Sequence, residues 1–327
     1  MMKDLVIIGV LLLAVEMAYI WMARRLNIVD RPHLQSSHTG VVVRGGGIVF
    51  YVAFLCWFLL SGMHYPLSFL GLTLLVSISF ADDIHSINPK VRLVCQFIAF
   101  LVMLYDMQVF NQPLQPLVLL SVACVGAVNI YNFMDGINGM TGGYSLVIVL
   151  ALIYVNTYVA PFADSMLLFM VLISIIVFGL FNFRKKAVCF AGDVGSLAIG
   201  YIILFLILKL FLQEAQMYWL SFLAVYAVDG GLTILHRAFL NDSLMKPHKK
   251  HVYQMMVNEL GMSHLKVSLI YMGLQTVCCV WIIAVPANTT FFIQIVLLSV
   301  AYLWFIRRYY HLHEEKLKSS HDNGKTA

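Results

Sequence analysis

Two adjacent carboxylates, Asp82 and Asp83, stand at the end of a long apolar run of the chain. Ionisable side chains at membrane depth are costly unless they meet cations or water, so they are candidates for function by default. The alternative is that both carboxylates lie in a solvated loop beside Lys90 and Arg92. In a functional site, hard oxygen ligands of this kind favour Mg²⁺ or Mn²⁺ over zinc.

A second polar stretch ends another apolar run. Asn129, Asn132 and Asp135 recur at a spacing of three, which puts them on one face of a helix. Glycines follow at positions 136, 139, 142 and 143, and glycine lets a backbone approach a ligand closely. This pattern favours a phosphate or nucleotide site. A small-residue helix contact through Gly139 and Gly143 is the alternative, but it leaves Asp135 unexplained.

Two further aspartates stand beside glycines. Asp193, in the sequence Gly-Asp-Val-Gly, precedes an apolar run and is either a helix N-cap or a ligand of a divalent cation. Asp229 lies inside a later apolar run and is followed by two glycines. A carboxylate buried at such a position must be paired or surrounded by polar groups.

A dense cationic segment follows, in which His248, Lys249 and His251 stand close together. Arg237 lies upstream of it, at the end of an apolar run. Such a cluster suits the oxygens of a diphosphate. The alternatives are a juxtamembrane basic patch and a zinc site, although the flanking lysines would repel a cation.

The first polar segment also carries hydrogen-bond donors and flexible backbone. Ser37, His38 and Arg44 lie in it, and three glycines follow at positions 45 to 47. By itself this segment indicates no particular chemistry.

Apolar runs of membrane-spanning length position all of these residues. A hydrocarbon core about 30 Å thick needs about 20 helical residues. Eleven runs can be delimited, at residues 4–22, 45–63, 65–81, 91–106, 115–131, 142–160, 165–182, 195–212, 217–235, 264–285 and 289–306. The segments between them then alternate between two compartments, and nineteen of the 21 Lys and Arg residues fall on one side. The positive-inside rule predicts an all-α polytopic membrane protein of about 11 transmembrane helices, with its N-terminus outside and its C-terminus in the cytoplasm.

Composition supports this class and excludes others. Hydrophobic residues make up 61% of the chain and charged residues 11%, whereas soluble domains carry about 25% charged residues. The net charge of +5 reflects basic residues that flank the membrane, so no nucleic-acid partner is expected. None of the six cysteines has metal-ligand spacing. Residues 1–310 are predicted to form one transmembrane catalytic domain, and residues 311–327 a polar cytoplasmic tail.

Together the acidic, amide and basic groups meet at one membrane surface. A lipid-borne phosphate and a cytosolic nucleotide could both reach that surface. The residue types therefore predict a metal-assisted phosphoryl transfer onto a lipid phosphate.

With these motifs in place, the chain resembles the polyprenyl-phosphate N-acetylhexosamine-1-phosphate transferase superfamily. The likeness runs from about Asp30 to Gln254, in the family's order. It comprises Asp-x-Pro with Ser-Ser-His and Arg-Gly-Gly, the Asp82–Asp83 pair with Pro-Lys-x-Arg, the Asn129–Gly139 stretch, Gly-Asp-x-Gly-Ser, and the histidine segment. The resemblance implies a bacterial inner-membrane enzyme that transfers a sugar-1-phosphate from a UDP-linked aminosugar to undecaprenyl phosphate and releases UMP.

The resemblance also implies roles for individual residues. Asp193 and Asn132 would hold Mg²⁺, and Asn138 would contact the uridine. Other implied substrate-binding residues are Arg237, Lys249, Lys90, Ser37, His38 and Arg44. The implied catalytic residues are Asp82, Asp83, Asp135, His248 and His251. A homodimer is a further expected assembly.

The chain departs from the family pattern at three places. Asn138 stands where many bacterial members have Asp, and Ser86 where others have Asp or Lys. The histidine segment reads Pro-His-Lys-Lys-His-Val-Tyr-Gln, which resembles the branch that starts O-antigen or capsule chains with deoxy-aminosugars. These departures make the MurNAc-pentapeptide substrate of peptidoglycan synthesis the least expected one.

Two other classes compete with this interpretation. An ion-coupled transporter would use carboxylates near the membrane midplane, such as Glu16 and Asp229, and would show an internal repeat. A membrane subunit that has kept the fold without the activity would not need the acidic and histidine residues. We find no internal repeat, and most acids gather at one predicted surface.

Overall fold

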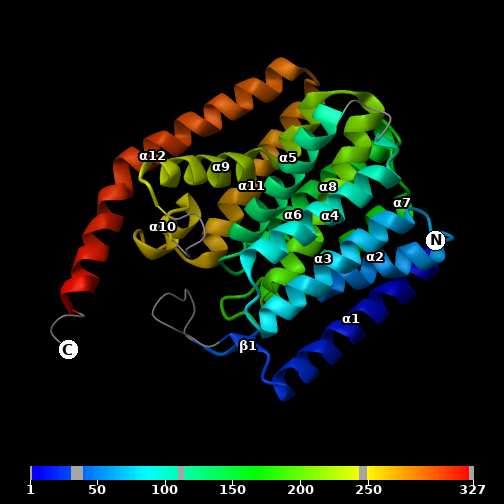
Figure 1. Cartoon of the computed structure of the whole chain (residues 1–327), viewed down its shortest axis with the longest axis horizontal. Helices are drawn as coiled ribbons and strands as arrows, with labels where there is room; N and C mark the ends of the chain where they lie inside the picture. Colours follow the sequence, from blue (N-terminus) through cyan, green and yellow to red (C-terminus); the bar gives the residue numbers. More distant parts are fainter. Residues whose placement is uncertain (1, 31–39, 110–113, 243–248, 324–327) are drawn as a thin grey trace.

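The protein is an all-α membrane protein, as the sequence predicts. The computed structural model describes residues 2–30, 40–109, 114–242 and 249–323. The elements are α1 (Met2–Arg25), β1 (Val29–Asp30), β2 (Val42–Val43), α2 (Ile48–Leu60), α3 (Pro66–Ile84), α4 (Pro89–Asp106), α5 (Leu114–Phe133), α6 (Met140–Tyr158), α7 (Ser165–Asn182), α8 (Gly192–Glu214), the 3₁₀-helix η2 (Met217–Leu223), α9 (Ala224–Phe239), α10 (Val252–Asn258), α11 (His264–Ala284) and α12 (Asn288–Asn323). Figure 1 shows them as one bundle of long helices.

Each of the eleven predicted apolar runs coincides with a helix, the ninth with η2 and α9 together. Within the described residues, eight helices are long and apolar enough to cross a membrane; α2 and the part of α5 from residue 117 to 133 are apolar but shorter. Helices suit hydrocarbon because they satisfy their backbone polar groups internally. The chain is therefore a multi-pass membrane protein, while the number of crossings and their direction stay predictions.

Local signals fix where several helices begin. Asn88 caps α4, because its side chain accepts a hydrogen bond from the Lys90 N–H at 2.9 Å, and Pro89 occupies the first helical position. Asp164 caps α7 in the same way through the Met166 N–H. These caps set the residue at which each of the two helices begins.

Helix α8 forms the centre of the bundle. Its residues from Val194 to Leu208 are all buried, which is expected of a helix that is hydrophobic on every side. Helices α1 and α12 lie at the periphery (Figure 1) and expose large apolar side chains, for example Val6 and Val296. Because lipid tails are apolar, such exposed faces are suited to the membrane interior.

A small β-structure ties the first polar segment to the start of α8. Strands β1 and β2 pair antiparallel, with Val29 opposite Val43. Val43 also forms a parallel bridge with Cys189, and Gly46 N–H donates to the Phe190 carbonyl at 2.8 Å. A side chain at Gly47 would collide with Gly195, so glycine is required for this approach. We call the end of the bundle that carries β1, β2 and α10 the site end.

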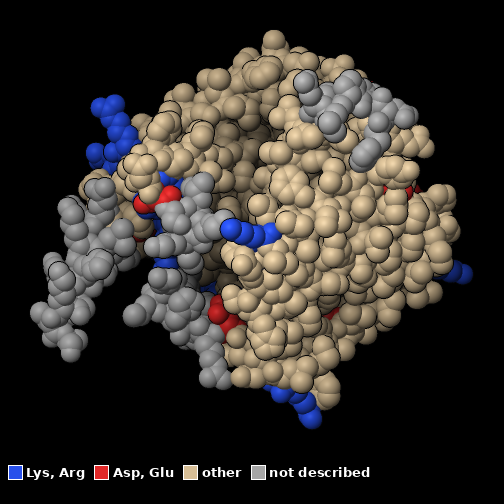
Figure 2. Space-filling view, in the orientation of Figure 1, with Lys and Arg blue, Asp and Glu red and all other residues tan. Residues whose placement is uncertain are grey.

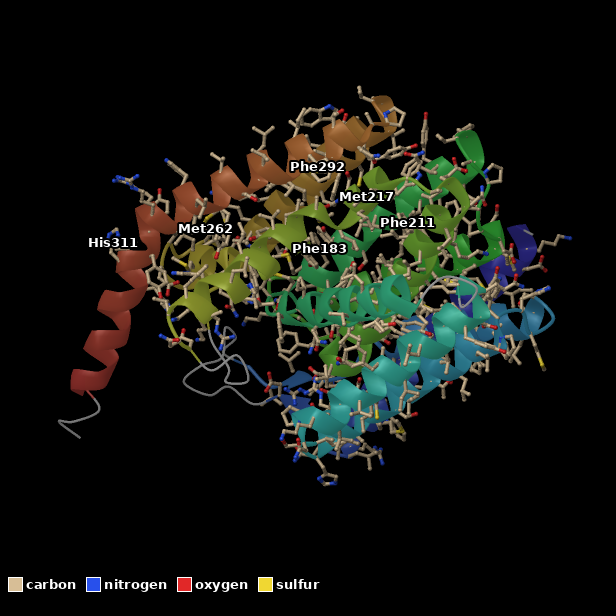
Figure 3. All side chains as sticks on the ribbon, turned by 45° about the horizontal axis from the view of Figure 1, so that its top comes forward. Phe183, Phe211, Met217, Met262, Phe292 and His311 are labelled. Atoms are coloured by element: carbon tan, nitrogen blue, oxygen red, sulfur yellow. The ribbon has the colours of Figure 1, made fainter. Side chains whose placement is uncertain are left out.

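Helix α12 extends beyond the last predicted apolar run. The sequence places the end of the last membrane run at residue 306 and a polar tail from residue 311, whereas α12 continues to Asn323. The boundary predicted at 310/311 therefore falls inside a helix. In Figure 3, Phe292 lies on the part of α12 beside the bundle, and His311 on the part that extends away from it.

The predicted sidedness can be tested by labelling. Lys186→Cys lies in the exposed segment after α7, and Thr157→Cys lies at the opposite end of α6. In a background without native cysteines, we expect a membrane-impermeant maleimide to label Thr157→Cys on intact cells and Lys186→Cys only after cell lysis. Labelling of both positions on intact cells would contradict the predicted topology.

Candidate active site at the site end of the bundle

A single guanidinium joins carboxylates from two helices. Arg92 Nη1 lies 2.5 Å from Asp82 Oδ2, and Arg92 Nη2 lies 2.6 Å from Asp193 Oδ2. The three side chains belong to α4, α3 and α8, and each is only partly exposed. Charge-assisted hydrogen bonds of this kind are among the stronger ones, and the fixed fork of arginine suits two acceptors. Arg92 thus holds the start of α8 against the end of α3.

Asp83 supports the same junction from the backbone side. Its Oδ1 accepts from the Asp193 N–H and its Oδ2 from the Val194 N–H, both at 3.3 Å. Arg44 Nε lies 3.5 Å from Asp83 Oδ1 and supplies a positive charge from the first polar segment. Asp83 therefore accepts from the N-terminus of α8, where unpaired N–H groups attract anions. Its side chain is nearly buried, whereas Arg44 remains substantially exposed.

The backbone at Gly192 makes this junction possible. Its φ of +70° lies in the left-handed region that glycine adopts readily. A Cβ there would also lie 2.7 Å from Asp83 Oδ2 and 2.8 Å from the Gly45 nitrogen. The glycine before Asp193 is thus explained by close packing of three segments.

The two predicted metal ligands lie together. The Asn132 side chain interacts with the Asp193 carboxylate, and its Oδ1 accepts from Ser196 Oγ at 2.7 Å. The Ser196 hydroxyl also lies 3.0 Å from the Gly192 carbonyl. Asn132 belongs to the last turn of α5, where the sequence placed it. Its side chain therefore lies beside the first turn of α8.

Asp135 lies in the turn between α5 and α6, next to these acids. Burial raises its pKa from the ordinary 3.8 to about 8, and the negative charges of Asp193 and Asp83 contribute to the rise. Asp82, Asp83, Asp135 and Asp193 are thus brought together at one place, as predicted.

Asn138, which was predicted to contact the uridine, makes its hydrogen bonds within the protein in this structure. Its side chain is buried and donates from Nδ2 to the Arg184 carbonyl at 2.9 Å. Ser268 Oγ donates to the Asn138 carbonyl, which joins the turn to α11. In this structure Asn138 therefore organises the loop after α7, and its contact with uridine stays a prediction.

The predicted basic residues are distributed unevenly. Arg237 is buried in the last turn of α9, and His251 is buried at the start of α10. Lys90 is exposed at the start of α4, and Lys249 is partly exposed. Ser37, His38 and His248 lie outside the described residues. Tyr253 connects this region to the acids, because its hydroxyl donates to the Phe133 carbonyl at 2.8 Å.

The donor set is compatible with Mg²⁺. Among the described residues, no group of three or more His, Cys, Asp and Glu side chains is placed to hold a metal ion. Mg²⁺ does not require such a cage, since it commonly binds one or two carboxylates together with substrate phosphates and water. Asp193 and Asn132 offer the hard oxygens that this mode uses, so the predicted site fits by chemistry.

Three residues at this site were missed as site residues by the sequence analysis. Arg92 was noted only as part of a motif, Ser196 was part of a glycine motif, and Asn182 was not singled out. Asn182 Oδ1 accepts from the Gly139 N–H at 2.8 Å, and its Nδ2 donates to the Cys189 carbonyl at 2.9 Å. A polar residue at the last position of an apolar run was the signal available for Asn182.

Sequence comparisons show which known proteins this chain is similar to. The family model of glycosyl transferase family 4 matches residues 65–211, just under half of the chain, and this range contains Asp82, Arg92 and Asp193. A probable undecaprenyl-phosphate N-acetylglucosaminyl 1-phosphate transferase of Bacillus subtilis (strain 168) is 23% identical over 273 residues, which cover 76% of this chain and 75% of the relative. Undecaprenyl-phosphate alpha-N-acetylglucosaminyl 1-phosphate transferases are similar too, at 24% identity in Salmonella typhi (73% of this chain, 72% of the relative) and 23% in Escherichia coli K12 (72% and 70%).

The fold and the site define a multi-pass helical membrane protein with a cluster of acidic side chains at one end of its bundle. The family match and these relatives confirm the resemblance that the motifs indicated. Residues 65–211 match glycosyl transferase family 4, and the chain is similar to members of the polyprenyl-phosphate N-acetylhexosamine-1-phosphate transferase superfamily.

The raised pKa of Asp135 predicts a pH-dependent stability in the absence of metal. Between pH 3.8 and about 8 the folded state holds a proton that the unfolded state has released, so stability falls as pH rises through this range. We expect the melting temperature in detergent with EDTA to fall from pH 6 to pH 8. We expect Asp135→Asn to make that fall smaller by about a few degrees, because the variant lacks the carboxyl group whose pKa is raised. Parallel melting curves for both proteins would contradict the assigned environment.

Proposed function

We propose that the protein transfers a sugar-1-phosphate from a UDP-linked aminosugar to undecaprenyl phosphate and releases UMP. The acceptor and the type of reaction are supported by the names of the relatives, which are undecaprenyl-phosphate N-acetylglucosaminyl 1-phosphate transferases. The product would serve as the first lipid-linked intermediate of an O-antigen, a capsule or another surface glycan. The proposed location is the bacterial cytoplasmic membrane, with the site end facing the cytoplasm.

The acidic cluster at the start of α8 carries this proposal. Carboxylates from α3 and α8 and an amide from α5 converge there, with Arg92 and Arg44 beside them. Phosphoryl transfer needs chiefly positioning and the neutralisation of phosphate charge. A cluster that combines oxygen ligands for a divalent cation with fixed guanidinium groups meets both needs.

An apolar cavity beside α5 supports a lipid substrate. Its volume is about 260 Å³. Its lining comes from α5, α8, η2 and α9 and consists of Ala123, Gly126, Ala127, Ile130, Tyr131, Leu204, Leu223, Tyr226 and Ala227. The visible face in Figure 2 is hollowed at its upper centre, where Figure 1 places α5 and α9. A prenyl chain lying in this cavity would have its phosphate near the end of α5, and α5 ends beside Asn132.

The proposed chemistry is a direct displacement. An oxygen of the lipid phosphate attacks the phosphorus next to the sugar, and the bond from that phosphorus to the oxygen bridging it to UMP breaks. The electron pair of that bond leaves with UMP, and the product is a polyprenyl-diphospho-sugar. The lipid phosphate is already an anion at neutral pH, so no side chain must remove a proton from it.

Asp193 and Asn132 would hold the Mg²⁺ ion, which supplies charge neutralisation to the diphosphate when bound. Arg44 is exposed enough to contact a phosphate oxygen, and Arg92 keeps Asp193 oriented. The other carboxylate oxygen of Asp82, Oδ1, accepts a hydrogen bond from the Ile87 N–H at 2.7 Å. This bond fixes the loop between α3 and α4. Asp82 and Asp83 thus act first as orienting groups in this proposal.

The two carboxylates that a transporter would use are tied to the site end. Glu16 is buried and accepts a hydrogen bond from Cys189 Sγ at 3.3 Å. Asp229 accepts from the Val252 N–H at 3.1 Å. Both therefore serve segments next to the acidic cluster, which favours the transferase over an ion pathway.

The reaction is tested directly on membranes that contain the protein. UDP-sugars radiolabelled in the sugar, including UDP-GlcNAc and UDP-linked deoxy-aminosugars, are incubated with undecaprenyl phosphate and Mg²⁺. Transfer of label into an organic-soluble diphospho-sugar, with one UMP per product, is the expected result. Release of free sugar phosphate without lipid product would contradict the proposal.

The role of Asp193 is tested against a matched acid on the same helix. Asp193 lies in the first turn of α8, and Glu214 is the last residue of the helix, at the opposite end of the bundle. We expect Asp193→Ala to lower kcat by about 100-fold or more while membrane insertion is unchanged, because it removes a charge needed in the transition state. Glu214→Ala is expected to retain near-normal turnover. Comparable rates for the two variants would remove Asp193 from the site.

The lipid cavity is tested by filling it. A side chain at Gly126 meets no heavy atom within 4 Å of its Cβ, so Gly126→Leu should fold and occupy the cavity. We expect KM for undecaprenyl phosphate to rise about tenfold and KM for the UDP-sugar to change by less than about twofold. Gly179→Leu, on α7 with equally open space, is the control. An unchanged lipid KM in Gly126→Leu would place the prenyl chain elsewhere.

A further inference from the structure

Asp229 is a buried carboxylate that none of the proposed steps uses. It lies in α9 and is only 4% exposed. Tyr271 OH on α11 donates to its Oδ2 at 2.5 Å, and Thr233 Oγ1 lies 3.3 Å from its Oδ1. Moving a carboxylate out of water costs several kcal/mol unless it is well paired. The groups that contact the Asp229 carboxylate should therefore indicate the role of its negative charge.

Two of its partners belong to the start of α10. The Val252 N–H donates to Asp229 Oδ1 at 3.1 Å, and His251 Nδ1 lies 3.4 Å from the same oxygen. His251 is also the N-cap residue of α10, and its backbone N–H donates to Gln254 Oε1 at 3.3 Å. One oxygen of Asp229 thus fixes both the imidazole and the first turn of α10.

The same turn is fixed to the acidic cluster. Tyr253 OH donates to the Phe133 carbonyl, two residues before Asp135. A side chain at Gly136 would collide with the Tyr253 hydroxyl, which shows how closely α10 packs against this turn. The segment from His251 to Tyr253 is therefore held between Asp229 on one side and the α5–α6 turn on the other. Lys249 lies two residues before this segment.

The charge of Asp229 matters most to the imidazole. A neutral amide at position 229 could still accept from the Val252 N–H, whereas a carboxylate also selects the imidazole form that carries a proton on Nδ1. Thr233 extends the network to α12, because its hydroxyl lies 3.0 Å from Tyr302 OH. Residues of α9, α11 and α12 thus form one hydrogen-bond network around the Asp229 carboxylate, which lies next to His251.

We propose that Asp229 is a positioning residue that acts through His251 and holds the segment from His251 to Tyr253 at the edge of the site that receives the nucleotide diphosphate. This inference rests on the proposed transferase function. It predicts that Asp229 affects the binding of the nucleotide sugar and does not affect the binding of the lipid substrate.

The test compares Asp229→Asn with Tyr271→Phe. We expect Asp229→Asn to raise KM for the UDP-sugar about tenfold and to change KM for undecaprenyl phosphate by less than about twofold. Tyr271→Phe removes a donor from the other oxygen and keeps the charge, so a change of less than about threefold is expected. Equal changes in both KM values for Asp229→Asn would indicate a general structural role and overturn the proposal.

A double-variant comparison tests whether Asp229 acts through His251. His251→Gln should show the same selective rise in KM, and adding Asp229→Asn to it should produce no further loss. Losses that multiply in the double variant would overturn the proposal. An unchanged nucleotide KM in His251→Gln would do so as well, even if Asp229→Asn failed to fold.

A chemical readout separates this inference from the transferase activity itself. His251 is buried beside Asp229, and His313 is likewise buried, with its Nδ1 2.7 Å from Glu259 Oε1. We expect Asp229→Asn to accelerate modification of His251 by diethyl pyrocarbonate about fivefold or more and to leave His313 unchanged. If no UDP-sugar is turned over by the unaltered protein, the transferase proposal fails while this measurement still decides the position of His251. Equal His251 reactivity in both proteins would overturn the role of Asp229.

Discussion

The ion-pair bridge from Asp82 through Arg92 to Asp193 is the interaction on which the rest of the site depends. It joins α3, α4 and α8 at a place where Asp83 adds a further negative charge. Without the guanidinium, these carboxylates would repel one another in a partly buried environment, where charges interact more strongly than in water. The bridge thus permits an arrangement of acids that can receive a divalent cation and phosphate groups.

The surrounding fold makes this bridge rigid. Helix α8 is buried along most of its length, so its first turn cannot shift without disturbing the core of the bundle. The paired backbone of residues 43–46 and 188–190 supports the loop before Asp193, and glycines at 47, 192 and 195 allow the close approach. The apolar interior therefore sets the position of the polar site through the helix ends.

The sequence predicted the helices and the gathering of the acids, because long apolar runs and charge asymmetry report directly on burial and on the membrane. It did not predict which helix ends touch. Arg92 and Asp193 are 101 residues apart, and their contact depends on the packing of α3, α4 and α8. The burial of Asn138 and His251 was equally hidden, since an amide or imidazole in a polar motif can face a ligand or a neighbouring helix. The exact end of α12 could not be read from the sequence, because its last turns are polar.

The most direct test of the bridge is a double-variant melting experiment in EDTA with Arg92→Gln, Asp193→Asn and their combination. If Arg92 neutralises Asp193, removing the guanidinium alone leaves unbalanced carboxylates, and removing the Asp193 charge as well relieves part of that repulsion. The double variant should then melt about a few degrees above Arg92→Gln alone. Losses that simply add in the double variant would show that the two residues are independent and would contradict the account.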